Sequence, residues 1–147
     1  MTALTYDLHK LTALLDRVAD GLLREHEAVS YSRFLALFAV QETSGSQRDV
    51  ARWLGLTEPS TSRMVAVLAE EGLLRATKTT GAGNRRRLQL TEEGAAVVAR
   101  CAALLESRFE SLVQRSGVSY NAYQRQTKRL LEELSAEQVL LLPRRAG

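Results

Sequence analysis

Two short helical segments joined by a tight turn constrain the fold of this chain more than any other feature. A first helix is predicted over residues 47–54, because Ser46 can accept a backbone hydrogen bond as its N-cap. Gly55 then permits a sharp turn. A second helix is predicted over residues 58–71, with Thr57 as its N-cap. Two short helices this close in sequence predict a helix-turn-helix unit.

Each of these two helices has an apolar face with helical spacing. We expect the following residues to face inward and to hold the helices at a fixed angle: Val50, Trp53, Leu54, Leu56, Met64, Val65, Leu68 and Ala69. The exposed positions at the start of the second helix are predicted to be Ser60, Thr61, Ser62 and Arg63. Hydroxyl groups can bond to phosphates or base edges, and arginine can form two hydrogen bonds to guanine. A similar unit also occurs in protein-interaction modules, so this feature alone leaves both functions open.

A change of period after Gly72 predicts a β-hairpin. Residues 74–79 and 86–90 alternate like short strands, and the glycine-rich stretch 81–84 can turn between them. The arginines that follow the turn are Arg85, Arg86 and Arg87. An arginine at such a tip suits the narrow minor groove of DNA, where negative potential is concentrated. Because consecutive strand residues point to alternate faces, the other arginines would contact phosphate or stay solvated.

Further helices are predicted on both sides of this unit. One spans about residues 5–27, and the others are predicted to begin at side-chain caps: Ser30, Thr91 and Ser119. The last of them is expected to reach about Leu134, with a separate short turn from Ser135. The apolar stripes of the two long helices consist of Leu11, Leu14, Leu15, Val18 and Leu22, and of Val98, Cys101, Leu105, Phe109 and Leu112.

These stripes are longer than one compact core of this size needs. We therefore expect residues 1–29 and 92–147 to form the helical interface of a homodimer, with a monomeric, loosely packed bundle as the alternative. The expected fold class is mainly α with a small β-hairpin. It is a single domain over residues 1–147, in which the winged helix-turn-helix, the DNA-binding lobe, spans residues 30–91.

Positive charge is concentrated in one segment. The chain has 147 residues and a net charge of +3, yet residues 43–90 carry eight basic and four acidic side chains, a local charge of +4. This excess suits a phosphate backbone, with a solvated basic surface as the alternative. A single cysteine cannot form an intrachain disulfide, and no stretch resembles a signal peptide or a bilayer span, so the expected location is the cytoplasm.

Three stretches of the sequence resemble the MarR (multiple antibiotic resistance regulator) family: Thr57–Val65, Leu68–Arg75 and Leu90–Gly94. The order of the predicted elements is also similar over nearly the whole chain. The resemblance implies a transcriptional regulator, typically a repressor, that acts as a homodimer. It implies recognition helices in successive major grooves of a pseudo-palindromic operator in double-stranded DNA, with the wings in flanking minor grooves. It also implies that a small ligand or oxidation relieves the repression.

The resemblance also assigns DNA contacts. Ser62 and Arg63 match the family's Ser-Arg pair on the recognition helix, and Arg85 or Arg86 matches its wing arginine. Asn84 stands where the family usually has an aspartate, which would hold that arginine by a stronger, charge-assisted bond. Which arginine enters the groove therefore stays open. The expected DNA-binding residues are Ser46, Gln47, Thr57, Ser60, Thr61, Ser62, Arg63, Lys78, Asn84, Arg85 and Arg86.

The resemblance further implies an effector pocket between the lobe and the dimerisation helices. The candidate residues for a small aromatic carboxylate are His26, Tyr31, Arg33, Phe34 and Trp53. The alternative is that Phe34 and Trp53 belong to the core. Cys101 is expected to be a small core hydrophobe, because the family's peroxide-sensing cysteine lies near the N-terminus. No cofactor or metal site is expected, since the two histidines and the cysteine lie far apart in sequence.

Two other classes of function compete with DNA binding. An enzyme is not expected, because the sequence contains no nucleophile elbow, phosphate-binding loop or metal-ligand cluster. A winged-helix module that binds a protein instead of DNA remains open. Salt distinguishes these two readings, because DNA binding weakens steeply as the salt concentration rises.

Overall fold

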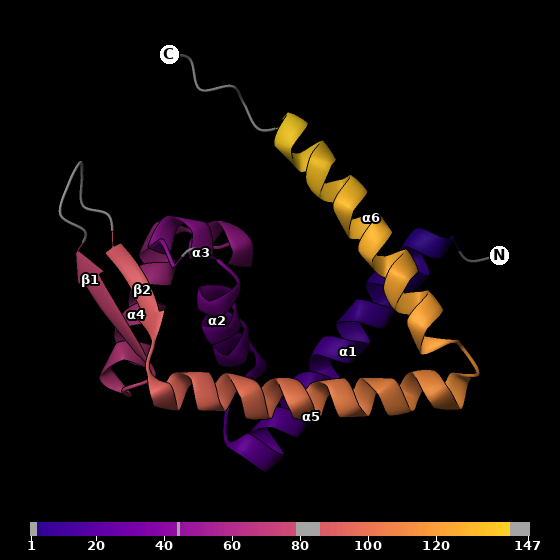
Figure 1. The fold of residues 1–147 in the computed structure, drawn as a ribbon, viewed down its shortest axis with the longest axis horizontal. Helices are drawn as coiled ribbons and strands as arrows, with labels where there is room; N and C mark the ends of the chain where they lie inside the picture. Colours follow the sequence, from indigo (N-terminus) through magenta and orange to yellow (C-terminus); the bar gives the residue numbers. More distant parts are fainter. Residues whose placement is uncertain (1–2, 44, 79–85, 142–147) are drawn as a thin grey trace. The chain divides into compact units, whose positions relative to one another are not determined.

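The computed structural model describes residues 3–43, 45–78 and 86–141, which are mainly helical with one small antiparallel sheet (Figure 1). The chain divides into two compact units, Met1–Leu105 and Glu106–Gly147, and each is described by itself. This architecture confirms the expected fold class. The elements in chain order are α1 (Leu4–Glu27), α2 (Tyr31–Glu42), α3 (Gln47–Leu54), α4 (Glu58–Glu70), β1 (Leu74–Lys78), β2 (Arg86–Leu90), α5 (Glu92–Ser116) and α6 (Tyr120–Leu141).

The predicted side-chain caps are all present. In each case a hydroxyl oxygen accepts a backbone N–H from the first turn of the helix that follows. Each cap therefore satisfies an N–H group that has no partner within its own helix. The capping residues are Ser30 for α2, Ser46 for α3, Thr57 for α4, Thr91 for α5 and Ser119 for α6.

The end of α6 differs from the prediction. Instead of stopping near Leu134, the helix continues through Ser135 to Leu141. No glycine or proline occurs between Tyr120 and Leu141. Ala136, Glu137 and the residues after them are good helix formers, so one serine does not interrupt the helix. The predicted separate turn from Ser135 is therefore wrong.

The core of the first unit surrounds α2, which contacts α1, α3 and β2. Leu37 of α2 is fully buried, together with Leu23 of α1 and Leu68 of α4. Leu88 of β2 and Val98 of α5 belong to the same cluster. The helix-turn-helix, the hairpin and the first part of α5 therefore share a single core, which fixes α4 relative to the hairpin.

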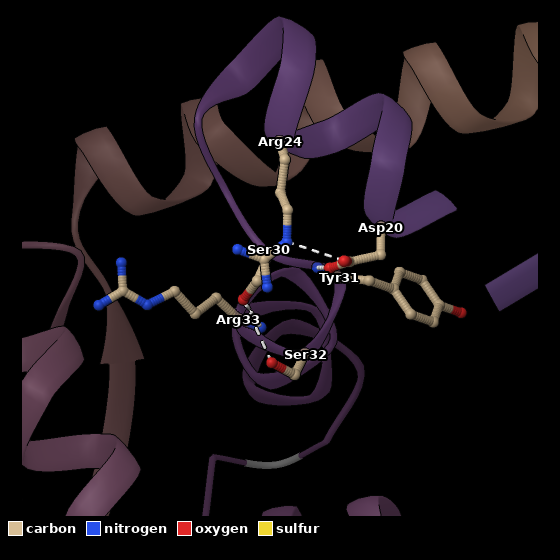
Figure 2. A network of polar contacts seen from close by, with 6 residues as sticks. All are labelled: Asp20, Arg24, Ser30, Tyr31, Ser32 and Arg33. Atoms are coloured by element: carbon tan, nitrogen blue, oxygen red, sulfur yellow. Dashed lines mark hydrogen bonds and ion pairs between the residues drawn. The ribbon is translucent and has the colours of Figure 1, made fainter. Parts of the chain in front are cut away.

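A carboxylate on α1 holds the start of α2 (Figure 2). Asp20 accepts the backbone N–H of Tyr31 through Oδ1 at 2.9 Å and the Nε–H of Arg24 through Oδ2 at 2.8 Å. The hydrogen bond from Tyr31, followed by that from Arg24, lowers the pKa of the Asp20 carboxyl below its ordinary value. Because Tyr31 is the first residue of α2, Asp20 satisfies one of the N–H groups that this helix leaves unpaired.

The hairpin pairs in register from Leu74 with Leu90 to Lys78 with Arg86. On the other edge of β2, the Leu88 N–H donates to the Gly45 carbonyl, and Ser46 forms a bridge with Arg87. Gly45 has a φ of +84°, and a Cβ on it would lie 2.4 Å from the Leu88 carbonyl oxygen. Only glycine fits this approach, so it lets the segment before α3 lie against the hairpin.

Among the described residues, none of the helices combines the length and the apolar composition that crossing a bilayer requires.

Candidate nucleic-acid interface

The first turn of α4 presents a small hydrogen-bonded relay. Thr57 accepts the backbone N–H of Ser60 and donates its hydroxyl proton to the Ser60 hydroxyl oxygen at 3.0 Å. The Arg63 guanidinium donates to the same Ser60 oxygen at 3.3 Å. A hydroxyl has two acceptor sites and one proton. Both acceptor sites of Ser60 are therefore used, and its proton is oriented toward an outside acceptor such as a phosphate or a base.

Thr61 does not belong to this exposed surface. Its exposed fraction is 0%, and its hydroxyl donates to the Thr57 carbonyl oxygen at 2.9 Å. The spacing explains this position, because Thr61, Val65 and Leu68 lie on one face of α4 and all three are buried. The expectation that Thr61 is exposed is therefore wrong, whereas Arg63 is exposed and Ser60 and Ser62 are half-buried.

Two apolar residues expected to face inward are largely exposed. Trp53 on α3 is 45% exposed, and Leu56 in the turn is 44% exposed. Val50 and Ala51 form the buried face of α3. Trp53 lies at the edge of that face, with its ring 5.9 Å from the ring of Phe38. In so short a helix two buried positions complete the contact with the core, which leaves Trp53 at the margin.

The start of α3 lies next to the start of α4. The hydroxyl of Ser46 caps α3, and Gln47 is half-buried. Arg48 forms an ion pair with Glu58 on α4, with 3.4 Å between Nε and Oε1. Neither member of this pair was among the expected DNA-binding residues. The signal that could have found them is their position, since each lies in the first turn of one helix of the predicted unit.

The hairpin carries cations at the end of its described part. Lys78 and Arg86 are directly opposite each other across the strands, and both are exposed. Like charges in this position destabilise a sheet, so the arrangement becomes favourable only near an anion such as phosphate. Arg87 is also exposed, opposite Thr77, although it was not among the expected contacts.

Two of the expected wing contacts, Asn84 and Arg85, lie outside the described residues, as does the glycine-rich turn.

The expected effector residues form an aromatic row and an ion pair. The row runs from Tyr31 through Phe34 and Phe38 to Trp53, with ring centroids 5.6 to 6.2 Å apart. Phe34 is buried, and burial, with a smaller effect of Asp16, raises the pKa of the Tyr31 hydroxyl.

The two basic candidates for effector binding differ in their surroundings. Arg33 is paired with Glu71 at the end of α4, and His26 is exposed. The protein therefore already supplies a carboxylate to the guanidinium expected to bind an effector.

A groove of about 450 Å³ lies elsewhere in the first unit. None of the five candidate effector residues lines it. Its lining consists of Val40, Gln41, Thr43, Gly45, Thr77, Arg87, Leu88, Gln89, Leu90 and Ala95. The effector pocket among the five candidates thus stays a prediction.

Cys101 is fully buried in α5, as expected of a core residue. Burial raises the pKa of its thiol, the Glu27 carboxylate adds to this effect, and Arg100 opposes it. A raised pKa keeps the thiol protonated and therefore unreactive. Within the described residues, no three His, Cys, Asp or Glu side chains gather as a metal site would require.

One family model matches the sequence, that of the IclR helix-turn-helix domain, over residues 32–78. This range contains α2, α3, α4 and β1, so it agrees with the helix-turn-helix described above. No curated protein sequence matches the chain.

Solved structures of regulators resemble the chain over nearly its whole length. Wild-type MarR from E. coli has a TM-score of 0.72 at 16% identity, covering 91% of this chain and 98% of its own. MepR from Staphylococcus aureus, in a complex with DNA, has a TM-score of 0.69 at 20% identity, covering 92% and 98%. A MarR family protein from Mycobacterium tuberculosis, in a complex with salicylic acid, has a TM-score of 0.67 at 22% identity, covering 91% and 97%. At these identities the likeness shows a shared fold, the one that the sequence motifs predicted.

Proposed function

We propose that this chain, which has the fold of the MarR-family regulators, is a sequence-specific transcriptional regulator of that family and binds double-stranded DNA. One observation carries the proposal: the exposed first turn of α4, with Ser60 and Arg63, belongs to the same compact unit as a hairpin whose end bears opposed cations. A helix end with oriented donors suits base edges, and a cationic hairpin suits phosphates or the minor groove.

The solved complexes support this reading. S. aureus MepR and E. coli MarR, which share the fold, have been crystallised with DNA and with operator DNA. In our proposal α4 enters the major groove, where Ser60, Ser62 and Arg63 face base edges and phosphates. Lys78, Arg86 and Arg87 flank the groove, together with Asn84 and Arg85.

The protein acts as a homodimer on a pseudo-palindromic site in this proposal. Exposed apolar side chains on the terminal helices support it, since Leu14 and Val18 of α1 are about half exposed, as are Leu131 and Leu134 of α6. Single exposed leucines are ordinary, but rows of them on long helices are typical of an interface. Dimer symmetry would place two copies of α4 one helical turn of DNA apart.

The proposal extends to regulation and place of action. A relative in the same fold binds salicylic acid, which supports a small aromatic effector that relieves repression by this chain. The residues proposed to bind it are His26, Tyr31, Arg33, Phe34 and Trp53. In this proposal the protein acts in the cytoplasm by binding DNA and not as an enzyme, because its fold is that of transcription regulators.

A selection of binding sites from random duplex DNA tests the proposal. We expect the protein to enrich an inverted repeat whose half-sites are separated by about one helical turn, roughly 10 base pairs. Affinity for this site should fall steeply as salt rises, because phosphate contacts release counterions. Failure to enrich any sequence, or binding to a protein partner that salt does not weaken, would contradict DNA recognition.

Replacing Arg63 distinguishes base contact from phosphate contact. We expect Arg63→Ala to relax the preference at one base position in each half-site and to weaken specific binding by about tenfold or more. The combined replacements Arg85→Ala and Arg86→Ala should instead weaken binding to all duplexes without unfolding the protein. Equal loss on all sequences for Arg63→Ala would make this residue a phosphate contact, and unchanged affinity of the double variant would remove the hairpin from the interface.

A further inference from the structure

A carboxylate stands at the end of α4 that would enter the major groove. Glu58 is the first residue of this helix, and 63% of its side chain is exposed. The first residues of a recognition helix face the bases, with the phosphate backbones on either side. A negative charge in this position repels the phosphates. Glu58 therefore lowers the affinity for DNA unless the groove offers its carboxylate a hydrogen-bond donor.

Arg48 is the ion-pair partner of Glu58 in the unbound protein. The pair joins the first turn of α3 to the first turn of α4, and 51% of the Arg48 side chain is exposed. Because solvent screens both groups, the pair adds little to stability. A phosphate beside Arg48 can therefore replace Glu58 as its partner at small cost. In that arrangement the Glu58 carboxylate loses its cation and has to find a donor in the groove.

We propose that Glu58 is a specificity-determining residue, whose carboxylate accepts a hydrogen bond from the N4 amino group of a cytosine in the major groove. Glutamate recognises cytosine in this way, whereas thymine and guanine present carbonyl oxygens that repel a carboxylate. A site with cytosine at this position offsets the repulsion by the phosphates, and a site without it does not. The inference rests on the proposed DNA-binding function and adds a recognition element to it.

Removal of the carboxylate tests this role. Binding sites are selected from random duplex DNA with the full-length protein, with Glu58→Ala and with Glu70→Ala. The last variant is a matched control, because Glu70 is also exposed and lies at the opposite end of the same helix. We expect the unmodified protein and Glu70→Ala to select the same sequence, with a cytosine in each half-site that Glu58→Ala no longer prefers.

Affinities sharpen the same test. The ratio of affinity for the selected duplex to that for an unrelated duplex should fall about tenfold in Glu58→Ala. Affinity for the unrelated duplex itself should rise, since a repulsive charge is removed. Arg48→Ala should weaken both duplexes equally and reduce the slope of log affinity against log salt by about one, without changing the preferred bases. Circular dichroism checks that each variant retains the helical content of the parent protein.

The outcomes separate the two proposals. If the unmodified protein enriches no sequence, both the proposed function and this inference are overturned. If it enriches a sequence and Glu58→Ala selects the same bases at every position, the role of Glu58 alone is overturned. An equal gain in affinity for all duplexes, with unchanged base preference, has the same consequence, because Glu58 would then act only as a general repulsive charge.

Discussion

Cys101 shows how the surroundings of one side chain decide its chemistry. The thiol is fully buried in α5, and burial together with the Glu27 carboxylate raises its pKa. An ionised thiol would be unfavourable there, so the folded protein binds the proton more tightly than the unfolded chain does. Folding stability and thiol ionisation are thereby linked.

This linkage predicts a loss of stability at alkaline pH. Below the ordinary pKa of a thiol, both folded and unfolded chains keep the proton and stability is full. As pH rises from about 7 to about 10, the unfolded chain loses its proton first, so the free energy of unfolding falls. Urea unfolding of the wild type and of Cys101→Ala measures the effect. The decline should be smaller in the variant, and an equal decline in both proteins would contradict the prediction.

Single residues also show what sequence patterns can and cannot specify. The caps at Ser30, Thr57 and Thr91 were predictable, because a hydroxyl before a periodic segment has a specific hydrogen bond to make. The burial of Thr61 was not, since its hydroxyl is satisfied by the Thr57 carbonyl oxygen within the helix itself. The exposure of Trp53 was missed because periodicity defines a face but not its margin.

At the scale of elements, the junction between α4 and α5 is held by contacts of Thr91. Its N–H donates to the Leu73 carbonyl oxygen at 3.1 Å, and its hydroxyl donates to the Gly72 carbonyl oxygen at 2.6 Å. The same hydroxyl oxygen accepts the Gly94 N–H at 3.0 Å. The start of α5 thus lies directly against the turn that follows α4, and Gly94 is buried in the contact.

This close approach predicts that Gly94→Ala is destabilising. An added Cβ would lie 1.9 Å from the Leu73 carbonyl oxygen, so the backbone would have to move. We expect the free energy of unfolding in urea to fall by about 1–3 kcal/mol, as in other overpacked sites. Gly21→Ala on α1 is the control, because nothing lies within 4 Å of its added Cβ. That variant should gain up to about 1 kcal/mol from helix propensity. Equal stability of the two variants would show that α5 can shift freely.

The order and type of the elements followed from sequence, but two features needed the structure. Residues 74–78 and 86–90 were predictable as strands because their pattern changes period after Gly72. The approach of Gly45 to Leu88 was not, since it depends on a backbone contact between distant segments. The Arg48–Glu58 pair was missed for the same reason, because it joins two helices whose relative placement a pattern does not give.

At the scale of the whole molecule, the apolar surface on the terminal helices exceeds what each unit buries by itself. Leu14 and Val18 are 48% and 55% exposed and lie four residues apart on α1. Residues at this spacing share one face of a helix. A second copy of the chain is the partner that the proposed function requires.

The dimer proposal predicts a mass and a way to change it. Light scattering at micromolar concentration should give about twice the 16.3 kDa of one chain. Replacing both residues, Leu14→Glu and Val18→Glu, should shift the mass to that of a monomer, because buried like charges oppose association. Ala66→Glu on the exposed face of α4 is the control and should remain dimeric. A wild-type protein that is monomeric under these conditions would disprove the interface.

The contact of residues 45 and 46 with β2 also bears on solubility. An open strand edge is a template on which another chain can add a strand, which is a common start of aggregation. β2 has β1 on one side and the Gly45–Ser46 segment on the other, so neither of its edges is open near Leu88. β1, the outer strand in the described part of the hairpin, carries exposed Arg75 and Lys78. Positive charges on an outer strand discourage pairing between copies. The residues proposed to meet DNA would thus also keep the protein from sticking to itself through its sheet when DNA is absent.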